Sequence, residues 1–153
     1  MSRKVLDTFD AQILSELQRN ARLTAREIAG RIGLSPAACQ KRMKRLRASG
    51  VIEAEVAIVA PEALGLSVMA IVHVRVARDG REELARFKQL MLAAPEVRQC
   101  YYVTGDDNFV VVVALPDMAA YASFSRRHFI ENDDVAHFIT GMVMERVKHT
   151  GRA

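Results

Sequence analysis

Residues 24–50 read TAREIAGRIGLSPAACQKRMKRLRASG, and this stretch predicts two short helices joined by a tight turn. Thr24 and Glu27 have the spacing of a capping box, in which each side chain satisfies a backbone N–H that the first helical turn leaves free. Gly33 favours the left-handed conformation that closes a helix, and Ala29, four residues earlier, is small enough for two helices to cross. The pattern is typical of a helix-turn-helix.

The second helix of this pair is strongly basic. Ser35 favours its start as an N-cap, and Pro36 occupies the first helical position, where proline is best tolerated. Its apolar residues fall on one face: Cys39, Met43 and Leu46. The other positions are polar and mostly cationic: Gln40, Lys41, Arg42, Lys44, Arg45 and Arg47. Any solvated helical hairpin can carry such charge, but the caps, the turn glycine and the one-sided charge together favour DNA binding.

The charge of the chain is divided unevenly along its length. Residues 1–50 hold 11 Lys and Arg against 4 Asp and Glu, whereas residues 51–153 hold 11 against 14. Such a division is typical of a basic nucleic-acid module attached to another domain. The two cysteines, Cys39 and Cys100, have no metal-ligand spacing. With no signal peptide and no apolar run long enough to span a membrane, we expect a cytoplasmic, nucleoid-associated protein.

The residues on either side of the helix pair extend this module. Asp7 can cap a first helix, which gives a three-helix, winged-helix-like domain over residues 1–50. The apolar stripe of that helix is Phe9, Ile13, Leu14 and Leu17. The pattern then changes to alternation, which predicts a strand over residues 51–59. A proline and a glycine follow, so residues 51–65 are interpreted as a linker strand and hinge.

Residues 66–153 are interpreted as two similar halves of one domain. The predicted elements are a strand at 66–77, a helix at 81–94, strands at 97–104 and 109–115, a helix capped by Asp117, and a final strand at 135–148. This order of elements is the ferredoxin-like βαββαβ arrangement, a four-stranded antiparallel sheet with both helices on one face. The chain is therefore predicted to be of the α+β class.

The uncovered face of this sheet is predicted to be apolar. Met69 and Ile71 alternate with the residues expected to face the helices, and part of the run at 109–115 also points outward. Exposed apolar surface of this extent is a liability for a monomer and is expected at a subunit interface. We therefore expect two sheets to pack face to face in a homodimer.

These elements and motifs resemble the Lrp/AsnC transcription regulators, also called feast/famine proteins, over nearly the whole chain. The motifs that carry the resemblance are LDTFDAQIL, GLSPAACQKRMKRLRASGVI, YYVTGDDNFVVVV, LPDMAAY and MVMERVK, in this order. The resemblance implies a DNA-binding domain, a linker strand, and a ferredoxin-like domain that assembles the protein and senses small molecules. It also implies dimers that associate into tetramers or octamers, with amino-acid effectors bound between neighbouring dimers.

The residues expected to contact DNA lie mainly on the basic helix. Its N-terminal residues can approach base edges or a phosphate, and its long side chains can bind guanine, adenine or phosphate. Thr24 and Arg26, at the start of the preceding helix, are expected to anchor phosphates. The full set is Thr24, Arg26, Ser35, Pro36, Ala37, Ala38, Gln40, Lys41, Arg42, Lys44 and Arg45.

A second site is expected at the turn of the central hairpin, Thr104-Gly105-Asp106-Asp107-Asn108. A glycine turn exposes N–H groups that can hold a carboxylate, and a nearby acid can accept an ammonium group. A plain hairpin turn needs the same residues for its backbone geometry alone, and the residues by themselves favour that reading.

The family resemblance instead favours an effector site at this turn. It implies that Tyr102, Met118, Thr140 and Met142 lie near the pocket or its response surface, although methionines also suit a core. The family commonly carries Asp where this chain has Asn108, which weakens the case for a charge pair with an amino group.

Nothing in the sequence indicates an active site or a cofactor. His73, His128, His137 and His149 have no metal-ligand or triad spacing, and phosphate-binding glycine motifs are missing. We therefore expect a sequence-specific transcription regulator, not an enzyme, whose assembly or DNA affinity responds to a small molecule such as an amino acid. Two alternatives stay open: an architectural DNA-wrapping protein without an effector, and a ferredoxin-like metabolic enzyme or enzyme-regulatory module whose basic helix is incidental.

Overall fold

The computed structural model describes residues 6–78 and 80–148, so His149 lies outside the described residues. The chain divides into two compact units, one that holds residues 6–58 and one that spans Val59–Arg146. No helix in the described ranges is long and apolar enough to cross a membrane.

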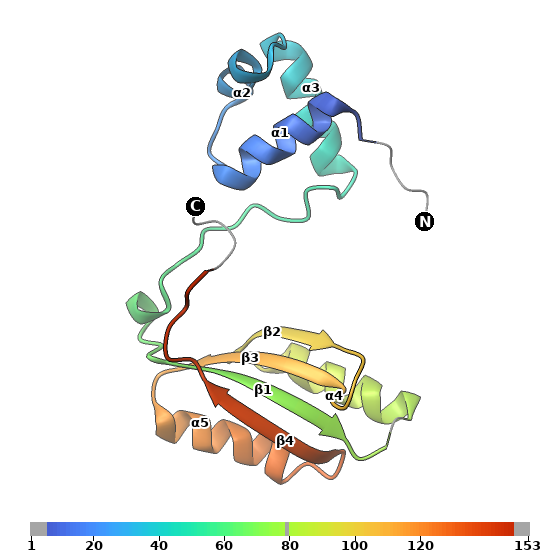
Figure 1. Ribbon diagram of the computed structural model, residues 1–153, viewed down its shortest axis with the longest axis vertical. Helices are drawn as coiled ribbons and strands as arrows, with labels where there is room; N and C mark the ends of the chain where they lie inside the picture. Colours follow the sequence, from blue (N-terminus) through green and yellow to red (C-terminus); the bar gives the residue numbers. More distant parts are fainter. Residues whose placement is uncertain (1–5, 79, 149–153) are drawn as a thin grey trace. The chain divides into compact units, whose positions relative to one another are not determined.

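The first unit is the three-helix domain expected from the sequence. It comprises α1 (Thr8–Arg19), α2 (Ala25–Ile32) and α3 (Pro36–Ala48) (Figure 1). The helices share one buried core: Ile13, Leu17, Ile28, Ala29, Cys39, Met43 and Leu46. Since none of these helices is long enough to be stable alone, this common core is what holds them in place.

The helix boundaries follow from local capping. Asp7 and Asp10 form a capping box on α1, and Thr24 and Glu27 form the predicted one on α2. Gly33 ends α2 with φ 74°, in the left-handed region that glycine adopts at little cost. The capping predictions for these helices are therefore confirmed.

The strand predicted over residues 51–59 does not form. Residues 53–59 belong to no helix or strand, and none of them has a backbone hydrogen bond within the described part of the chain. A strand needs a neighbouring strand to complete its ladder, and alternation alone does not provide one. Val56 and Ile58 are consequently exposed. A short 3₁₀ helix, η1 (Pro61–Leu64), follows this segment.

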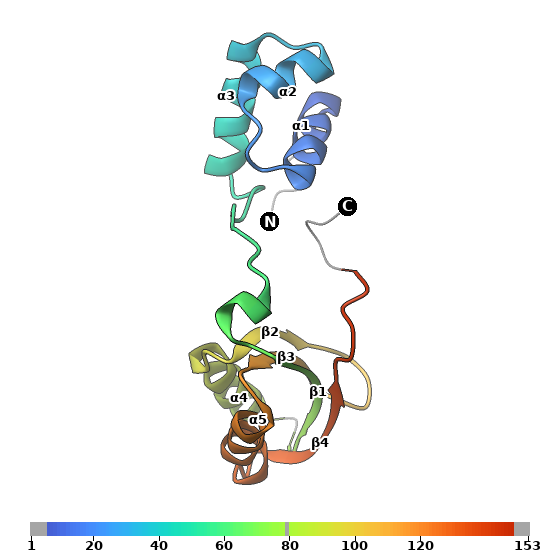
Figure 2. The same ribbon diagram turned by 90° about the vertical axis from the view of Figure 1, so that its left-hand side faces the viewer.

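The second unit has the predicted order of strands and helices. Its elements are β1 (Val68–Val76), α4 (Arg81–Ala93), β2 (Val97–Tyr102), β3 (Phe109–Leu115), α5 (Met118–Ser125) and β4 (Val135–Met142). The strands pair antiparallel in the order β2-β3-β1-β4. Both helices lie on one face of the sheet, which is clearest when the sheet is seen from its side (Figure 2). The ferredoxin-like prediction is confirmed.

The core of this unit lies between the sheet and its two helices. Inward side chains of the two central strands pack against aromatic residues of α4, α5 and the π-helical turn η2 (Arg126–Ile130) that follows α5. The largest fully buried members of this core are Phe87, Phe109, Phe124, Phe129, Met91 and Leu115, followed by Val72, Val74 and Val111.

The final strand is shorter than predicted. β4 ends at Met142, and the Val143 N–H makes one further bond to the Met69 carbonyl, close to the start of β1 at Val68. A bulge opposite Arg75 also shifts the alternation of side chains. As a result Val135 packs against the core, whereas Ile139, an even number of residues further along the strand, is exposed.

The outer face of the sheet is uncovered, as predicted. Ile71 pairs with Val112 and His73 pairs with Val110, so these neighbours point to the same side. The apolar residues of the outer face are Met69, Ile71, Tyr101, Val110, Val112 and Ile139.

Candidate nucleic-acid interface and effector site

The recognition helix α3 exposes its lysines. Its apolar side is buried, while Lys41, Lys44 and Gln40 are exposed along the opposite side. Neither lysine pairs with a carboxylate within the described residues. Pro36 and Ala37 are exposed at the start of the helix and leave room for close approach to this surface.

Two arginines predicted to contact DNA instead face α1. Arg42 Nη1 donates to Asp7 Oδ2 at 2.6 Å and to Asp10 Oδ1 at 2.9 Å. Arg45 Nη2 donates to the two carboxylate oxygens of Asp10 at 2.6 and 2.5 Å. The Arg42 guanidinium also lies 5.6 Å from the centre of the Phe9 ring. The sequence did carry a signal for this arrangement, because Asp10 shares the helical stripe of the buried residues that follow it in α1.

These contacts stabilise the charged forms of both partners. The pKa of Asp7 is lowered, first by the hydrogen bond from the Asp10 N–H and then by the Arg42 guanidinium. The pKa of Arg42 is raised by its hydrogen bonds to Asp7 and Asp10. The ion pair between Asp7 and Arg42 is therefore formed throughout the neutral pH range.

The residues predicted to contact DNA at the starts of α2 and α3 differ in whether their side chains already have partners within the protein. Thr24 Oγ1 donates to Glu27 Oε2 at 2.7 Å, and Ser35 Oγ accepts from the Ala38 N–H at 3.2 Å. Both hydroxyls are thus engaged in caps, and Ala38 is half-buried. Arg26 is exposed and has no ion pair among the described residues. It is the more available of the two predicted phosphate anchors.

The turn of the central hairpin is hydrogen-bonded to β1 through Asn108. The Asn108 N–H donates to the Val74 carbonyl at 2.9 Å, and its side-chain Oδ1 accepts from the Val76 N–H at 2.9 Å. Asn108 therefore has a structural role that needs an acceptor oxygen, which an amide supplies as well as a carboxylate. Gly105 adopts φ 127°, a conformation that L side chains rarely take.

The acids of this turn meet two residues from the outer face of the sheet. Arg75 Nε donates to the Asp106 carbonyl, and its guanidinium lies 3.8 Å from the Asp106 carboxylate. Asp107 Oδ2 lies 3.4 Å from His73 Nδ1. The Asp106 carboxylate and Thr104 are exposed to solvent, so both are accessible to a ligand.

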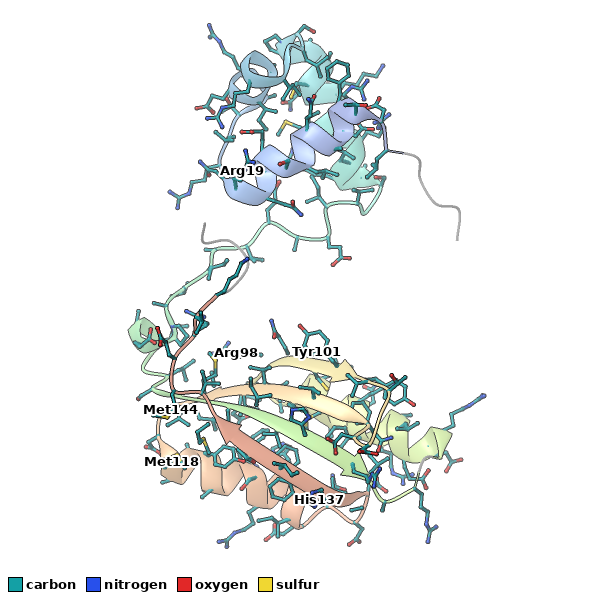
Figure 3. The ribbon with its side chains drawn as sticks, viewed as in Figure 1. Arg19, Arg98, Tyr101, Met118, His137 and Met144 are labelled. Carbon is teal, nitrogen blue, oxygen red and sulfur yellow. The ribbon has the colours of Figure 1, made fainter. Side chains whose placement is uncertain are left out.

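Of the remaining predicted effector residues, Tyr102 flanks this turn, whereas Met118, Thr140 and Met142 do not gather around it. Tyr102 lies on edge strand β2, whereas Thr140 and Met142 lie on β4, the opposite edge of the sheet. The Thr140 hydroxyl is hydrogen-bonded to the Tyr121 hydroxyl. Met118 is exposed at the start of α5, at the other end of the sheet from His137 on β4 (Figure 3). One chain alone therefore does not bring these residues into a single pocket.

A cavity that sequence reasoning did not identify lies between α4 and β2. It has a volume of about 420 Å³ and is lined mainly by apolar side chains, among them Met91, Leu92, Tyr102 and Phe109. Lys88 borders it, with its ammonium 4.6 Å from the centre of the Tyr102 ring. Across residues 6–78 and 80–148, no three His, Cys, Asp or Glu side chains come together as a metal site.

Comparison with known protein families matches both units of the chain. Residues 6–53 match the winged helix-turn-helix DNA-binding family. Residues 69–153 match the Lrp/AsnC ligand binding domain. The two matches follow the same order as the two structural units.

Individual relatives span nearly the whole chain. An HTH-type transcriptional regulator of Sinorhizobium fredii is 48% identical over 145 residues, covering 95% of this chain and 86% of that protein. The leucine-responsive regulatory protein of Haemophilus influenzae is 33% identical over 147 residues, covering 96% and 89%. The crystal structure of a Neisseria meningitidis transcriptional regulator in complex with L-methionine is similar with a TM-score of 0.89 at 30% identity, covering 97% and 96%.

Replacement of Gly105 by Val is expected to destabilise the second unit by about 1–3 kcal/mol, because its φ is nearly restricted to glycine. An added Cβ would meet no atom within 4 Å, so the cost arises in the backbone. Urea unfolding followed by tyrosine fluorescence measures it, since Tyr101, Tyr102 and Tyr121 all lie in the second unit.

Gly30→Ala in α2 is the control, because it changes a glycine of the first unit and should leave the tyrosine transition in place. If Gly105→Val unfolds at the same urea concentration as the unmodified protein, the turn does not depend on this backbone conformation.

Proposed function

The chain belongs to the Lrp/AsnC family of DNA-binding transcription regulators, and on this basis we propose that it binds specific DNA sequences as a homo-oligomer controlled by an amino acid. The family consists of regulators with a ligand-binding domain, not of enzymes. The observation that carries the proposal is a recognition helix with unneutralised lysines on a chain whose second unit matches that ligand-binding domain. This match also disfavours an architectural protein without an effector.

The proposed DNA contacts start from the exposed side of α3. Lys41 and Lys44 bind phosphates as unneutralised cations, and Arg26 anchors a further phosphate from the start of α2. Gln40 is the exposed side chain suited to an adenine edge. Ala37, at the start of α3, allows close approach to the groove. The other predicted residues border this surface and contribute to it mainly through helix caps and backbone groups: Thr24, Ser35, Pro36 and Ala38.

Replacement of Lys41 or Lys44 by Gln is expected to weaken duplex binding and to lower the slope of log K against log salt by about 1 per residue, because each phosphate contact releases counterions. Fluorescence anisotropy with a labelled duplex measures both quantities. Arg81→Gln, at the exposed start of α4, is the control and should leave the slope unchanged. Unchanged slopes in both lysine variants would remove these residues from the interface.

The outer face of the sheet supports assembly into a homodimer. A face that exposes Ile71, Tyr101 and Ile139 is more suited to burial than to solvent. Packing two such faces together gives a two-fold symmetric protein with two recognition helices. Such a protein matches a pseudo-palindromic site with half-sites about one helical turn, or a multiple of it, apart. Larger assemblies, to tetramers or octamers, are part of this proposal.

The proposed effector is an amino acid held at the turn of the central hairpin. The exposed Asp106 carboxylate can accept the α-ammonium group, and the backbone of the Gly105 turn can meet the α-carboxylate. Because Tyr102, Thr140 and Met142 lie on opposite edges of one sheet, a pocket that uses all of them is formed between copies of the chain. The leucine-responsive relative and the complex with L-methionine make leucine and methionine the first ligands to test.

A thermal-shift panel of the twenty amino acids tests this effector proposal. A ligand that binds only the folded protein at about 100 times its Kd adds roughly 2.7 kcal/mol of stability, which raises Tm by several degrees. Asp106→Asn should abolish the shift, whereas Asp133→Asn, in the loop before β4, should retain it. A panel in which no amino acid raises Tm would reject the effector and leave DNA binding intact.

A further inference from the structure

The carboxylate of Asp10 is an unusual feature of the first unit. It is only 1% exposed, yet it accepts hydrogen bonds from two arginines of the recognition helix. Its Oδ2 also accepts the Asp7 N–H as part of the capping box. A charge removed from water to this degree requires charged donors, because an unpaired buried carboxylate is strongly unfavourable.

The basic helix is largely neutralised by the domain's own acids. Besides the two arginines held by Asp10, Arg47 Nη2 donates to Glu55 Oε1 at 2.7 Å. Of the five cations of α3, three therefore face carboxylates, and only Lys41 and Lys44 lack a carboxylate partner among the described residues. The charge that α3 offers to DNA is thus much smaller than its sequence indicates.

We propose that Asp10 is a positioning residue for DNA binding, which fixes the rotation of α3 and withholds Arg42 and Arg45 from the phosphates. The bonds of Asp10 to two arginines one turn apart restrain the rotation of α3 in addition to the packing of its apolar face. In that rotation Lys41 and Lys44 point to solvent. The proposal rests on DNA binding alone and does not depend on an effector.

The restraint is releasable, because the arginines are not themselves buried. The side chain of Arg45 is 58% exposed and that of Arg42 is 26% exposed. When the charge of Asp10 is removed, Arg45 loses its carboxylate partner and can turn towards a phosphate, whereas Arg42 keeps its bond to Asp7. Non-specific DNA affinity should then rise together with its salt dependence, which loss of a helix cap alone would not cause.

The test uses the full chain and a fluorescently labelled 40-bp duplex of random sequence, titrated by anisotropy at several KCl concentrations. Asp10→Asn is expected to steepen the slope of log K against log salt by about 1, since Arg45 gains one phosphate contact and each contact adds about 0.9. Asp133→Asn makes the same change of charge in the second unit and should leave the slope unaltered. A folded Asp10→Asn protein with an equal or shallower slope overturns the proposal.

If Asp10→Asn does not fold, a second pair of variants tests whether Arg45 is withheld from phosphates. Arg45→Gln and Lys44→Gln each remove one cation from adjacent positions of α3, and Asp10 keeps Arg42 as a partner in both. The proposal expects Arg45→Gln to lower the salt slope by less than half as much as Lys44→Gln. Equal losses in the two variants would show that Arg45 binds phosphate freely and would contradict the restraint.

Discussion

The alternation of side chains along β1 is the constraint on which the second unit depends. This strand pairs with β3 on one side and β4 on the other, so its residues occupy the middle of the sheet. Its inward residues, such as Val72 and Val74, form the core with α4 and α5, and its outward residues form the uncovered face. His73 and Arg75 of the same outward row contact the acids of the hairpin turn. The surface suited to assembly and the turn suited to an effector are therefore linked through one strand.

The first unit, held by its apolar core, also contains a balance of charge between the basic helix α3 and the acids packed against it. Breaking a buried ion pair costs more than the pair itself contributes, so Asp10 restrains α3 without being a large source of stability. In the proposed function, two lysines of α3 are left to bind phosphates while Arg42 and Arg45 stay paired with acids of the first unit. A DNA-binding domain with less free charge depends more on specific contacts, because non-specific affinity arises almost entirely from phosphate neutralisation.

Much of this fold could be predicted from local sequence, because capping boxes, turn glycines and strand alternation act between residues close in the chain. The features that could not be predicted depend on distant partners. The segment at 51–59 has the alternation of a strand but no ladder partner within the described chain. The stripe of α1 marked Asp10 as buried, but sequence spacing did not show that its partners are Arg42 and Arg45, more than thirty residues away. The predicted effector residues occupy both edges of the sheet, and sequence spacing does not reveal strand order.

We propose that the outer face of the sheet joins two chains and so pairs two recognition helices. Sedimentation velocity of Ile71→Glu tests it most directly, with Leu92→Glu on α4 as a matched change at an exposed apolar residue away from that face. We expect the unmodified protein and the Leu92 variant to sediment as dimers or larger species, and the Ile71 variant to sediment as a folded monomer with weaker duplex binding. An Ile71 variant that keeps the size and DNA affinity of the unmodified protein would contradict it.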